Sequence, residues 1–303
     1  MPTGERIEVR ELTKRFGSVL AVDRLTFAAE PGRVTGFLGP NGAGKTTTLR
    51  MLLGLVRPTA GTATVGGRRY QDLRRPLCMV GAVLEASNFH PGRSGRDHLR
   101  ILAIEAGVPE SRVEEVLRLV GLDQSAHRRA GGYSLGMRQR LALAAALLGD
   151  PGVVVLDEPA NGLDPAGIHW MRGHLRTLAQ EGRTVVMSSH LLSEVQQIVD
   201  DVVIIADGRL VHASALAELE AAAVRTVHAV APDRSALLSA LRTAGLAAQP
   251  ADDHPVGVLV TGATPAQVGH IAFGAGVELH ELRSADGSLE DTFLRMVGQR
   301  GAP

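Results

Sequence analysis

The sequence contains a single cysteine, Cys78, and lacks any apolar run long enough to cross a membrane. One cysteine excludes a disulfide within the chain and suits a reducing cytosol. A transmembrane helix needs roughly 18 or more consecutive apolar residues, whereas the longest apolar run spans only residues 141–148. The first residues also lack the apolar core of a signal peptide. Any role at a membrane would therefore have to come through a partner.

A surplus of charge of one sign is also missing. The 32 basic residues balance the 32 acidic ones, so the formal net charge is zero. No global field then draws the chain onto nucleic acid or an anionic membrane, and we expect no nucleic-acid partner. At 303 residues, 45% of them hydrophobic, the chain is long enough for one large domain or two smaller ones.

Lysine is nearly absent, because Lys14 and Lys45 are the only lysines among the 32 basic residues. Lys45 belongs to residues 39–46, GPNGAGKT, which match the phosphate-loop pattern G-x-x-x-x-G-K-[ST]. The glycines let the backbone wrap around a phosphate, and N–H groups at the start of the following helix point at it. The expected nucleotide-binding residues here are Gly39, Pro40, Asn41, Gly42, Ala43, Gly44, Lys45, Thr46 and Thr47.

Two of these residues have individual roles in this interpretation. Lys45 would place a compact charge between the β- and γ-phosphates, and the Thr46 hydroxyl would bind Mg²⁺. The pattern can also arise by chance in a chain with 35 glycines. A predicted strand over 34–38 and a predicted helix over 47–53 give it the strand–loop–helix context that a phosphate site requires, which favours the functional interpretation.

A second apolar strand, over 153–156, ends in two carboxylates, Asp157 and Glu158. A strand end beside a phosphate loop is a suitable place for Mg²⁺, and Asp157 can hold the metal through oxygen. Glu158 faces a different way and can polarise a water for attack on the γ-phosphate. The alternative is a strand that simply ends in solvated acids. The phosphate loop earlier in the chain favours the catalytic interpretation.

Two further features follow the same logic. Ser134 suits the N-cap of a helix running to about residue 148, and with Gly136 it offers a second anion site at that helix N-terminus. The alternative is an ordinary capped core helix. His190 follows the predicted strand over 184–187. A lone histidine is more often structural, but its place after the strand that follows the carboxylates favours a catalytic role.

The order of predicted elements indicates an α/β fold with two parts. Alternating strands over 7–12 and 22–28 precede the phosphate loop, and continuous apolar strands over 153–156, 184–187 and 202–205 fit a sheet buried on both faces. Helices over 97–106 and 110–120 form a helical insertion, within about residues 88–150. We assign residues 1–222 to this nucleotide-binding domain.

Residues 223–303 are expected to form a separate C-terminal accessory domain. Strands over 226–231, 247–249, 256–261 and 277–282 alternate with helices over 234–244, 265–272 and 288–297. The order approximates β-α-β-β-α-β, a small α+β pattern of the ferredoxin-like kind.

Taken together, residues 5–215 resemble the nucleotide-binding subunit of an ABC transporter. The segment 39–46 matches Walker A, 153–158 matches Walker B and 161–165 matches the D-loop, with His190 as the switch histidine. Residues 133–137 match the signature motif in a variant form, with Leu135 in place of its usual first glycine. Phe16 matches the aromatic residue that stacks on adenine, although it could also be a core phenylalanine.

The resemblance implies a P-loop NTPase of the ABC cassette fold, with a RecA-like core and a helical subdomain. It implies ATP and Mg²⁺ as cofactors and ATP hydrolysis through Lys45, Glu158 and His190. It also implies a head-to-tail homodimer, in which Ser134 and Gly136 of one copy cover the ATP of the other. An integral-membrane permease is implied as partner, which would hold the chain at the cytoplasmic face of the cell membrane. The permease is expected to dock near residues 85–91.

Glu85 departs from the family pattern, which usually has glutamine in the loop between core and helical insertion. This variant resembles exporters that protect cells from bacitracin-like peptides and lantibiotics, so it favours drug or antibiotic export. Glu85 is a candidate metal ligand through its carboxylate oxygen.

Two other functions remain open. A soluble ABC-family ATPase acting on ribosomes or DNA tends to carry paired cassettes, a coiled-coil insert or a basic patch, and none of these is evident in the sequence. A nucleotide-switched regulator without turnover requires a defective base, whereas Glu158 and His190 are both present.

Overall fold

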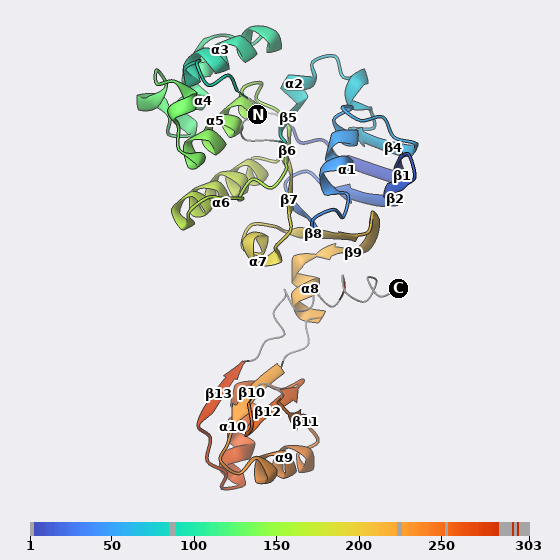
Figure 1. Ribbon diagram of the computed structural model, residues 1–303, viewed down its shortest axis with the longest axis vertical. Helices are drawn as coiled ribbons and strands as arrows, with labels where there is room; N and C mark the ends of the chain where they lie inside the picture. Colours follow the sequence, from blue (N-terminus) through green and yellow to red (C-terminus); the bar gives the residue numbers. More distant parts are fainter. Residues whose placement is uncertain are drawn as a thin grey trace. The chain divides into compact units, whose positions relative to one another are not determined.

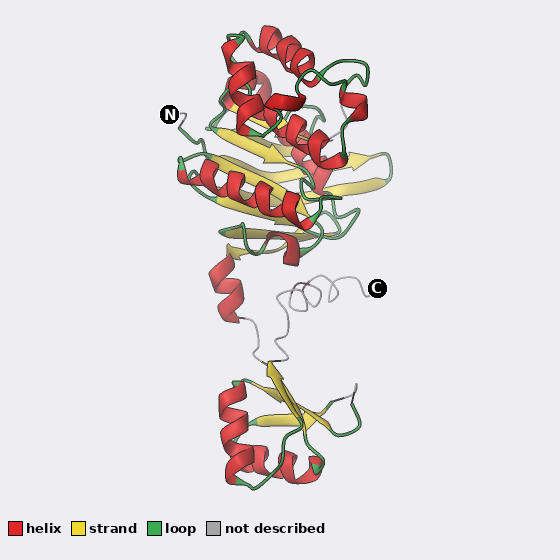
Figure 2. Ribbon diagram, turned by 90° about the vertical axis from the view of Figure 1, so that its left-hand side faces the viewer, coloured by secondary structure: helices red, strands yellow, loops and turns green. Residues whose placement is uncertain are grey.

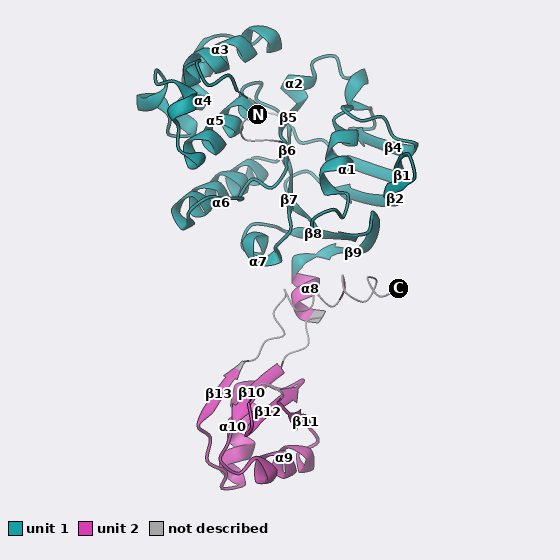
Figure 3. Ribbon diagram, in the orientation of Figure 1, with its two compact units in different colours: residues 1–216, 299–303 teal, residues 217–298 magenta. Residues whose placement is uncertain are grey.

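The computed structural model describes residues 3–84, 89–222, 226–251 and 254–284, together with Phe293 and Met296. The chain divides into two compact units, and the second begins at Ala217 (Figure 3). The sequence places the domain boundary nearby, after residue 222. Helix α8 (Leu216–Ala222) lies at this division.

The centre of the first unit is a six-stranded sheet in the order β5-β6-β7-β3-β8-β9. The first five strands run parallel and β9 joins antiparallel. Every residue of β3, β6 and β7 is buried, as expected for strands covered on both faces. The strands, in sheet order, are β5 (Val80–Val83), β6 (Val153–Leu156), β7 (Thr184–Ser189), β3 (Val34–Leu38), β8 (Asp201–Ala206) and β9 (Arg209–Ala215).

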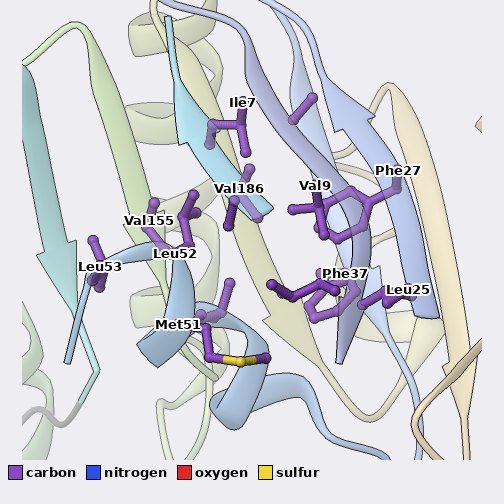
Figure 4. Close-up of a cluster of buried hydrophobic side chains, with 14 of the residues drawn as sticks. Ile7, Val9, Leu25, Phe27, Phe37, Met51, Leu52, Leu53, Val155 and Val186 are labelled. Atoms are coloured by element: carbon purple, nitrogen blue, oxygen red, sulfur yellow. The ribbon is translucent and has the colours of Figure 1, made fainter. Parts of the chain in front are cut away.

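A three-stranded antiparallel sheet, in the order β2-β1-β4, lies beside the large one. Its strands are β1 (Ile7–Phe16), β2 (Val19–Ala29) and β4 (Ala60–Val65). Figure 4 shows the core between the sheets, where Met51 and Leu52 of helix α1 (Lys45–Leu52) lie among buried strand side chains. Phe27 and Phe37 stack there with ring centroids 5.1 Å apart, so the phosphate-loop strand β3 is packed against the smaller sheet.

The predicted helical insertion is present between β5 and β6 and gathers at one side of the sheet in Figure 1. Helix α6, which follows β6, is the longest element that was not predicted from the sequence. Among the described residues, none of the helices combines the length and apolar character needed to cross a bilayer. The helices of the first unit are α1, α2 (Pro76–Met79), α3 (Gly95–Ala106), α4 (Ser111–Leu119), α5 (Leu135–Leu147), α6 (Pro165–Gln180) and α7 (Leu192–Val195), with 3₁₀ turns at Tyr70–Asp72, Asp123–Ser125 and Ala130–Gly132.

From β10 to β13, the second unit has the predicted order strand, helix, strand, strand, helix, strand. Its antiparallel sheet has the order β11-β12-β10-β13, and two helices cover one face of it (Figure 2). The last strand begins only at Glu281, later than predicted, and the predicted helix over 288–297 lies largely outside the described residues. The elements are β10 (Thr226–Val230), α9 (Arg234–Thr243), β11 (Ala247–Pro250), β12 (Gly257–Thr261), α10 (Pro265–Gly274) and β13 (Glu281–Ser284).

Candidate nucleotide-binding site

The phosphate-loop sequence forms the turn between β3 and α1. Gly42 and Gly44 have φ angles of 83° and 99°, which side-chain-bearing residues rarely adopt. A Cβ on Gly44 would also lie 2.5 Å from the carbonyl oxygen of Ala21. These two glycines therefore let the loop close tightly against β2, and the helix begins directly after it at Lys45.

Lys45 is almost enclosed by its surroundings, with 6% of its surface exposed. Its Nζ donates to the carbonyl oxygens of Gly39 at 2.6 Å and Pro40 at 3.2 Å. It also lies 3.2 Å from Oε1 of Glu158. The ammonium group thus points back over the loop, toward the place where the phosphate loop holds an anion.

Asp157 lies at the end of β6 with both carboxylate oxygens engaged. Thr46 donates to Oδ2 from Oγ1 at 2.6 Å, and Ser188 donates to Oδ1 from Oγ at 2.5 Å. A hydroxyl and a carboxylate are oxygen ligands of the kind that Mg²⁺ prefers. The structure therefore brings together Thr46 and Asp157, two of the three predicted metal ligands.

Glu158 has an unusual backbone for a residue with a side chain, because its φ is 48°. Such a conformation costs about 1–3 kcal/mol and persists only where surrounding contacts hold it. Its Oε2 lies 2.9 Å from Nδ1 of His190, and its Oε1 faces Lys45. The two acids are therefore held by specific partners, so the interpretation as freely solvated acids is wrong.

These residues meet because of the strand order. The strands β6, β7 and β3 are parallel neighbours, so their carboxyl ends lie along one edge of the sheet. The cleft at this edge has a volume of about 290 Å³. It is lined by Ala21, Asn41, Gly42, Ala43, Gly44, Lys45, Thr46, Thr47, Glu158, Asn161 and His190.

Ser134 and Gly136 are not among the residues that line this cleft. Ser134 is the N-cap of α5, as predicted, and its hydroxyl accepts from the Met137 N–H at 3.3 Å. Both predicted residues line a different cavity of about 290 Å³, together with Trp170 of α6. The start of the signature helix therefore lies apart from the phosphate loop of the same chain.

The remaining two candidates have different outcomes. Phe16 is 50% exposed, so the interpretation as a core phenylalanine is wrong. The Lys14 ammonium lies 4.7 Å from its ring centroid. Its stacking on adenine stays a prediction. Glu85 lies outside the described residues.

Two residues at the site were not predicted from the sequence. Ala21 lines the cleft from strand β2 of the small sheet, and nothing in the local sequence signals this. Ser188 contacts both Asp157 and Glu158. A polar residue at the end of the apolar run over 184–187 is a signal that could have pointed to Ser188, since buried hydroxyls need partners.

Comparisons with known families agree with this geometry. The family model described as ABC transporter matches residues 22–161. A second model, described as Domain of unknown function (DUF8746), matches residues 220–290.

Several named proteins are similar to this chain over about two thirds of its length. The bacitracin transport ATP-binding protein BcrA of Bacillus licheniformis is 44% identical over 207 residues, which cover 67% of this chain and 68% of that protein. BcrA of Enterococcus faecalis is 41% identical and covers 70% of each chain. The lantibiotic transport ATP-binding protein SrtF of Streptococcus pyogenes is 35% identical, covering 68% of this chain and 89% of that protein.

Solved structures show the same fold. A structure of the ATP binding subunit of an ABC transporter has a TM-score of 0.64 at 26% identity and covers 71% of this chain and 92% of that one. CbiO1 from Clostridium perfringens, part of an ABC transporter complex, has a TM-score of 0.64 at 26% identity and covers 71% and 90%. The predicted ABC cassette fold is confirmed, and the chain belongs to the ATP-hydrolysing, ATP-binding subunits of ABC transporters.

Proposed function

We propose that this chain hydrolyses MgATP to power a separate membrane permease that exports a peptide antibiotic. The observation that carries the catalytic part is the Glu158 carboxylate, held between Lys45 and His190 in the cleft. The class of cargo is supported by relatives named for bacitracin and lantibiotic transport at 35–44% identity. The variant Glu85 in the sequence supports the same class.

The chemistry follows from the positions of the side chains. The ATP phosphates would lie on the backbone N–H groups of the loop, with Lys45 neutralising charge on the γ-phosphate. Thr46 and Asp157 would hold Mg²⁺, and the bound ion would offset charge that develops on the phosphate oxygens. Glu158 would accept a proton from the attacking water. His190 would keep the Glu158 carboxylate turned toward that water.

Two copies of the chain are proposed to complete each site. Ser134 lies at the N-terminus of a helix of 13 residues, where N–H groups favour an anion. In this chain it does not line the cleft with Lys45, so it is available to a nucleotide held by another copy. Head-to-tail pairing would place Ser134 and Gly136 of one copy against the γ-phosphate held by the other.

Mixing two inactive variants should test this pairing. Lys45→Ala and Ser134→Arg homodimers would each be damaged at both sites, whereas a mixed dimer would have one site with both lesions and one intact site. We expect the mixture to regain tight nucleotide trapping at about one site per dimer, by the geometry of shared sites. Trapping is measured with radiolabelled ATP after subunit exchange, with permease present where isolated chains pair weakly.

The control for this experiment is each variant alone, carried through the same exchange step. No recovery, although mixed dimers are demonstrated by differently tagged chains, would show that each chain builds its site alone. The head-to-tail arrangement would then be wrong.

The permease is proposed to dock on an apolar groove beside the helical insertion. Two adjoining cavities, of about 190 and 310 Å³, share Tyr70, Ala82, Leu102 and Ala145. Phe89 lines the larger one, which places it next to the predicted docking segment over residues 85–91. Among the groove residues, Leu55 has 65% of its surface exposed, whereas a leucine in a closed core is buried. An exposed apolar side chain in a groove is typical of a protein–protein contact.

Leu55→Glu should weaken permease binding and leave nucleotide binding unchanged, because it puts a charge into the groove and Leu55 does not line the nucleotide cleft. The measurement is co-purification from membranes with a multi-span membrane protein, identified by mass spectrometry. Ile104→Glu is the matched control, since Ile104 is 80% exposed on α3 and does not line either cavity. We expect a loss of at least about tenfold in the retained fraction for Leu55→Glu alone, about 1.4 kcal/mol.

Two outcomes of that experiment would count against the proposal. Equal retention of both variants would remove the groove as the docking surface. A wild-type chain that does not accompany any membrane protein, and sediments with ribosomes or nucleic acid instead, would favour the soluble ATPase. BcrA and SrtF give no support to that alternative, since each of them is named for transport.

A further inference from the structure

Ser188 carries a buried hydroxyl near the carboxyl end of β7, an interior strand of the large sheet. It lies in β7 between the apolar residue Met187 and Ser189, and 0% of its surface is exposed. Parallel strands buried on both faces usually carry apolar side chains at such positions. Burying a hydroxyl costs free energy unless hydrogen bonds replace those to water. The contacts of Ser188 therefore indicate what the residue does.

Its hydroxyl bridges the two acidic residues. Ser188 Oγ donates to Asp157 Oδ1 at 2.5 Å and accepts from the backbone N–H of Glu158 at 2.8 Å. The group is thus used both as a donor and as an acceptor, on adjacent residues. Asp157 is held from the opposite side by Thr46, so its carboxylate is fixed between the phosphate loop and β7.

The backbone of Glu158 explains why such a bridge is needed. At a φ of 48°, the chain leaves the strand geometry of β6 directly after Asp157. A left-handed conformation in a residue with a side chain is maintained only by its surroundings. The bond from the Glu158 N–H to Ser188 is a contact of this kind, because it holds the peptide between the two acids.

We propose that Ser188 is a positioning residue for ATP hydrolysis. Its hydroxyl holds the Asp157–Glu158 peptide in the orientation that turns the Glu158 carboxylate toward Lys45 and His190. Without the hydroxyl, the peptide can rotate and the carboxylate moves relative to the attacking water. Misplacement of a reacting group by about 1 Å can cost about a hundredfold in rate. This inference rests on the proposed role of Glu158 as the base.

The experiment compares Ser188→Ala with Ser188→Thr in the full chain. The alanine variant loses both hydrogen bonds, whereas threonine keeps the Oγ and suits a strand. We expect kcat for ATP hydrolysis to fall by about ten- to a hundredfold in Ser188→Ala. The KM for ATP and the Kd for nucleotide measured without Mg²⁺ should stay within about threefold, because the phosphate loop is untouched. Ser188→Thr should keep most of the wild-type kcat.

Ser189→Ala is the matched control. Ser189 is the next residue in β7 and is also buried, but its hydroxyl donates to the Glu194 carboxylate at 2.9 Å and accepts from the Leu191 N–H at 3.1 Å. Ser189→Ala therefore loses buried hydrogen bonds without changing a contact of Asp157 or Glu158. We expect both alanine variants to lower Tm to a similar extent, and only Ser188→Ala to lower kcat strongly.

Three results would overturn the inference: wild-type kcat in Ser188→Ala, an equal fall of kcat in both alanine variants, or a folded Ser188→Thr that is as slow as Ser188→Ala. Glu158→Gln is measured alongside to separate this inference from the proposed function. Rapid turnover in Glu158→Gln would reject Glu158 as the base. Slow turnover in Glu158→Gln with rapid turnover in Ser188→Ala would reject the positioning role alone.

Discussion

Replacing Lys45 with alanine should lower the rate of ATP hydrolysis by about a hundredfold or more. The Lys45 side chain is nearly buried, and its ammonium group contacts both the phosphate loop and Glu158. Removal of a preorganised charge that stabilises the transition state typically costs about 10²–10³ in kcat. The measurement is phosphate release under saturating ATP, with Tm and circular dichroism to verify the fold.

Lys45→Arg is the informative companion to this variant. Arginine keeps the charge but replaces a compact ammonium by a larger planar group, which the enclosed position does not fit. We expect it to be strongly impaired as well. Near-normal turnover in Lys45→Ala would show that the loop over 39–46 is not the catalytic site.

Glu158→Gln should retain ATP but slow its hydrolysis by roughly 10²–10⁴, the contribution expected of a general base. The amide is close in shape to the carboxylate, so the contacts that place the side chain near His190 and Lys45 are largely preserved. The change removes the proton acceptor together with the negative charge that faces Lys45. The variant should then accumulate as an ATP-bound dimer, measured by size-exclusion chromatography with and without ATP.

Glu194→Gln provides the matched control for that variant. Glu194 is a carboxylate of α7 that bonds the Ser189 hydroxyl and does not line the cleft. Its kcat should stay within a few-fold of wild type. Unimpaired turnover in Glu158→Gln would mean that another group accepts the proton, and the assignment of Glu158 would fall.

The sequence predicted those features that depend on a few neighbouring residues, such as the phosphate loop and a helix N-cap. The phosphate loop is contiguous, and its glycines are needed by the backbone itself, so the pattern implies the turn. Ser134 as an N-cap is equally local, and the structure confirms it. Helix α6 was missed, although Asp164 at its N-cap and Pro165 at its first position are recognised start signals. The helix also contains Gly167 and Gly173, and glycine has a low helix propensity. The residues after the start signals therefore gave weak support for a helix.

Non-local features could not be derived from the chain alone. The contact between Glu158 and His190 depends on β6 and β7 being neighbours. The order of the predicted strands favoured a catalytic role for His190 but did not establish this pairing. The bridge made by Ser188 and the left-handed backbone of Glu158 depend on side-chain packing at one sheet edge. The same holds in the second unit, where β10 pairs with β12 and β13 but not with the strand that follows it in sequence.

Trp170 gives the protein a spectroscopic property of its own. It is the only tryptophan in the chain, and its ring centroid lies 4.3 Å from the guanidinium carbon of Arg140. It lines the same cavity as Ser134, the residue proposed to meet the nucleotide of a second copy. Indole emission depends on nearby charge and solvent, and a cation above the ring is a strong local influence. The chain thus carries a native fluorophore beside its proposed dimer contact, which allows stopped-flow measurement of closure without a dye or an engineered label.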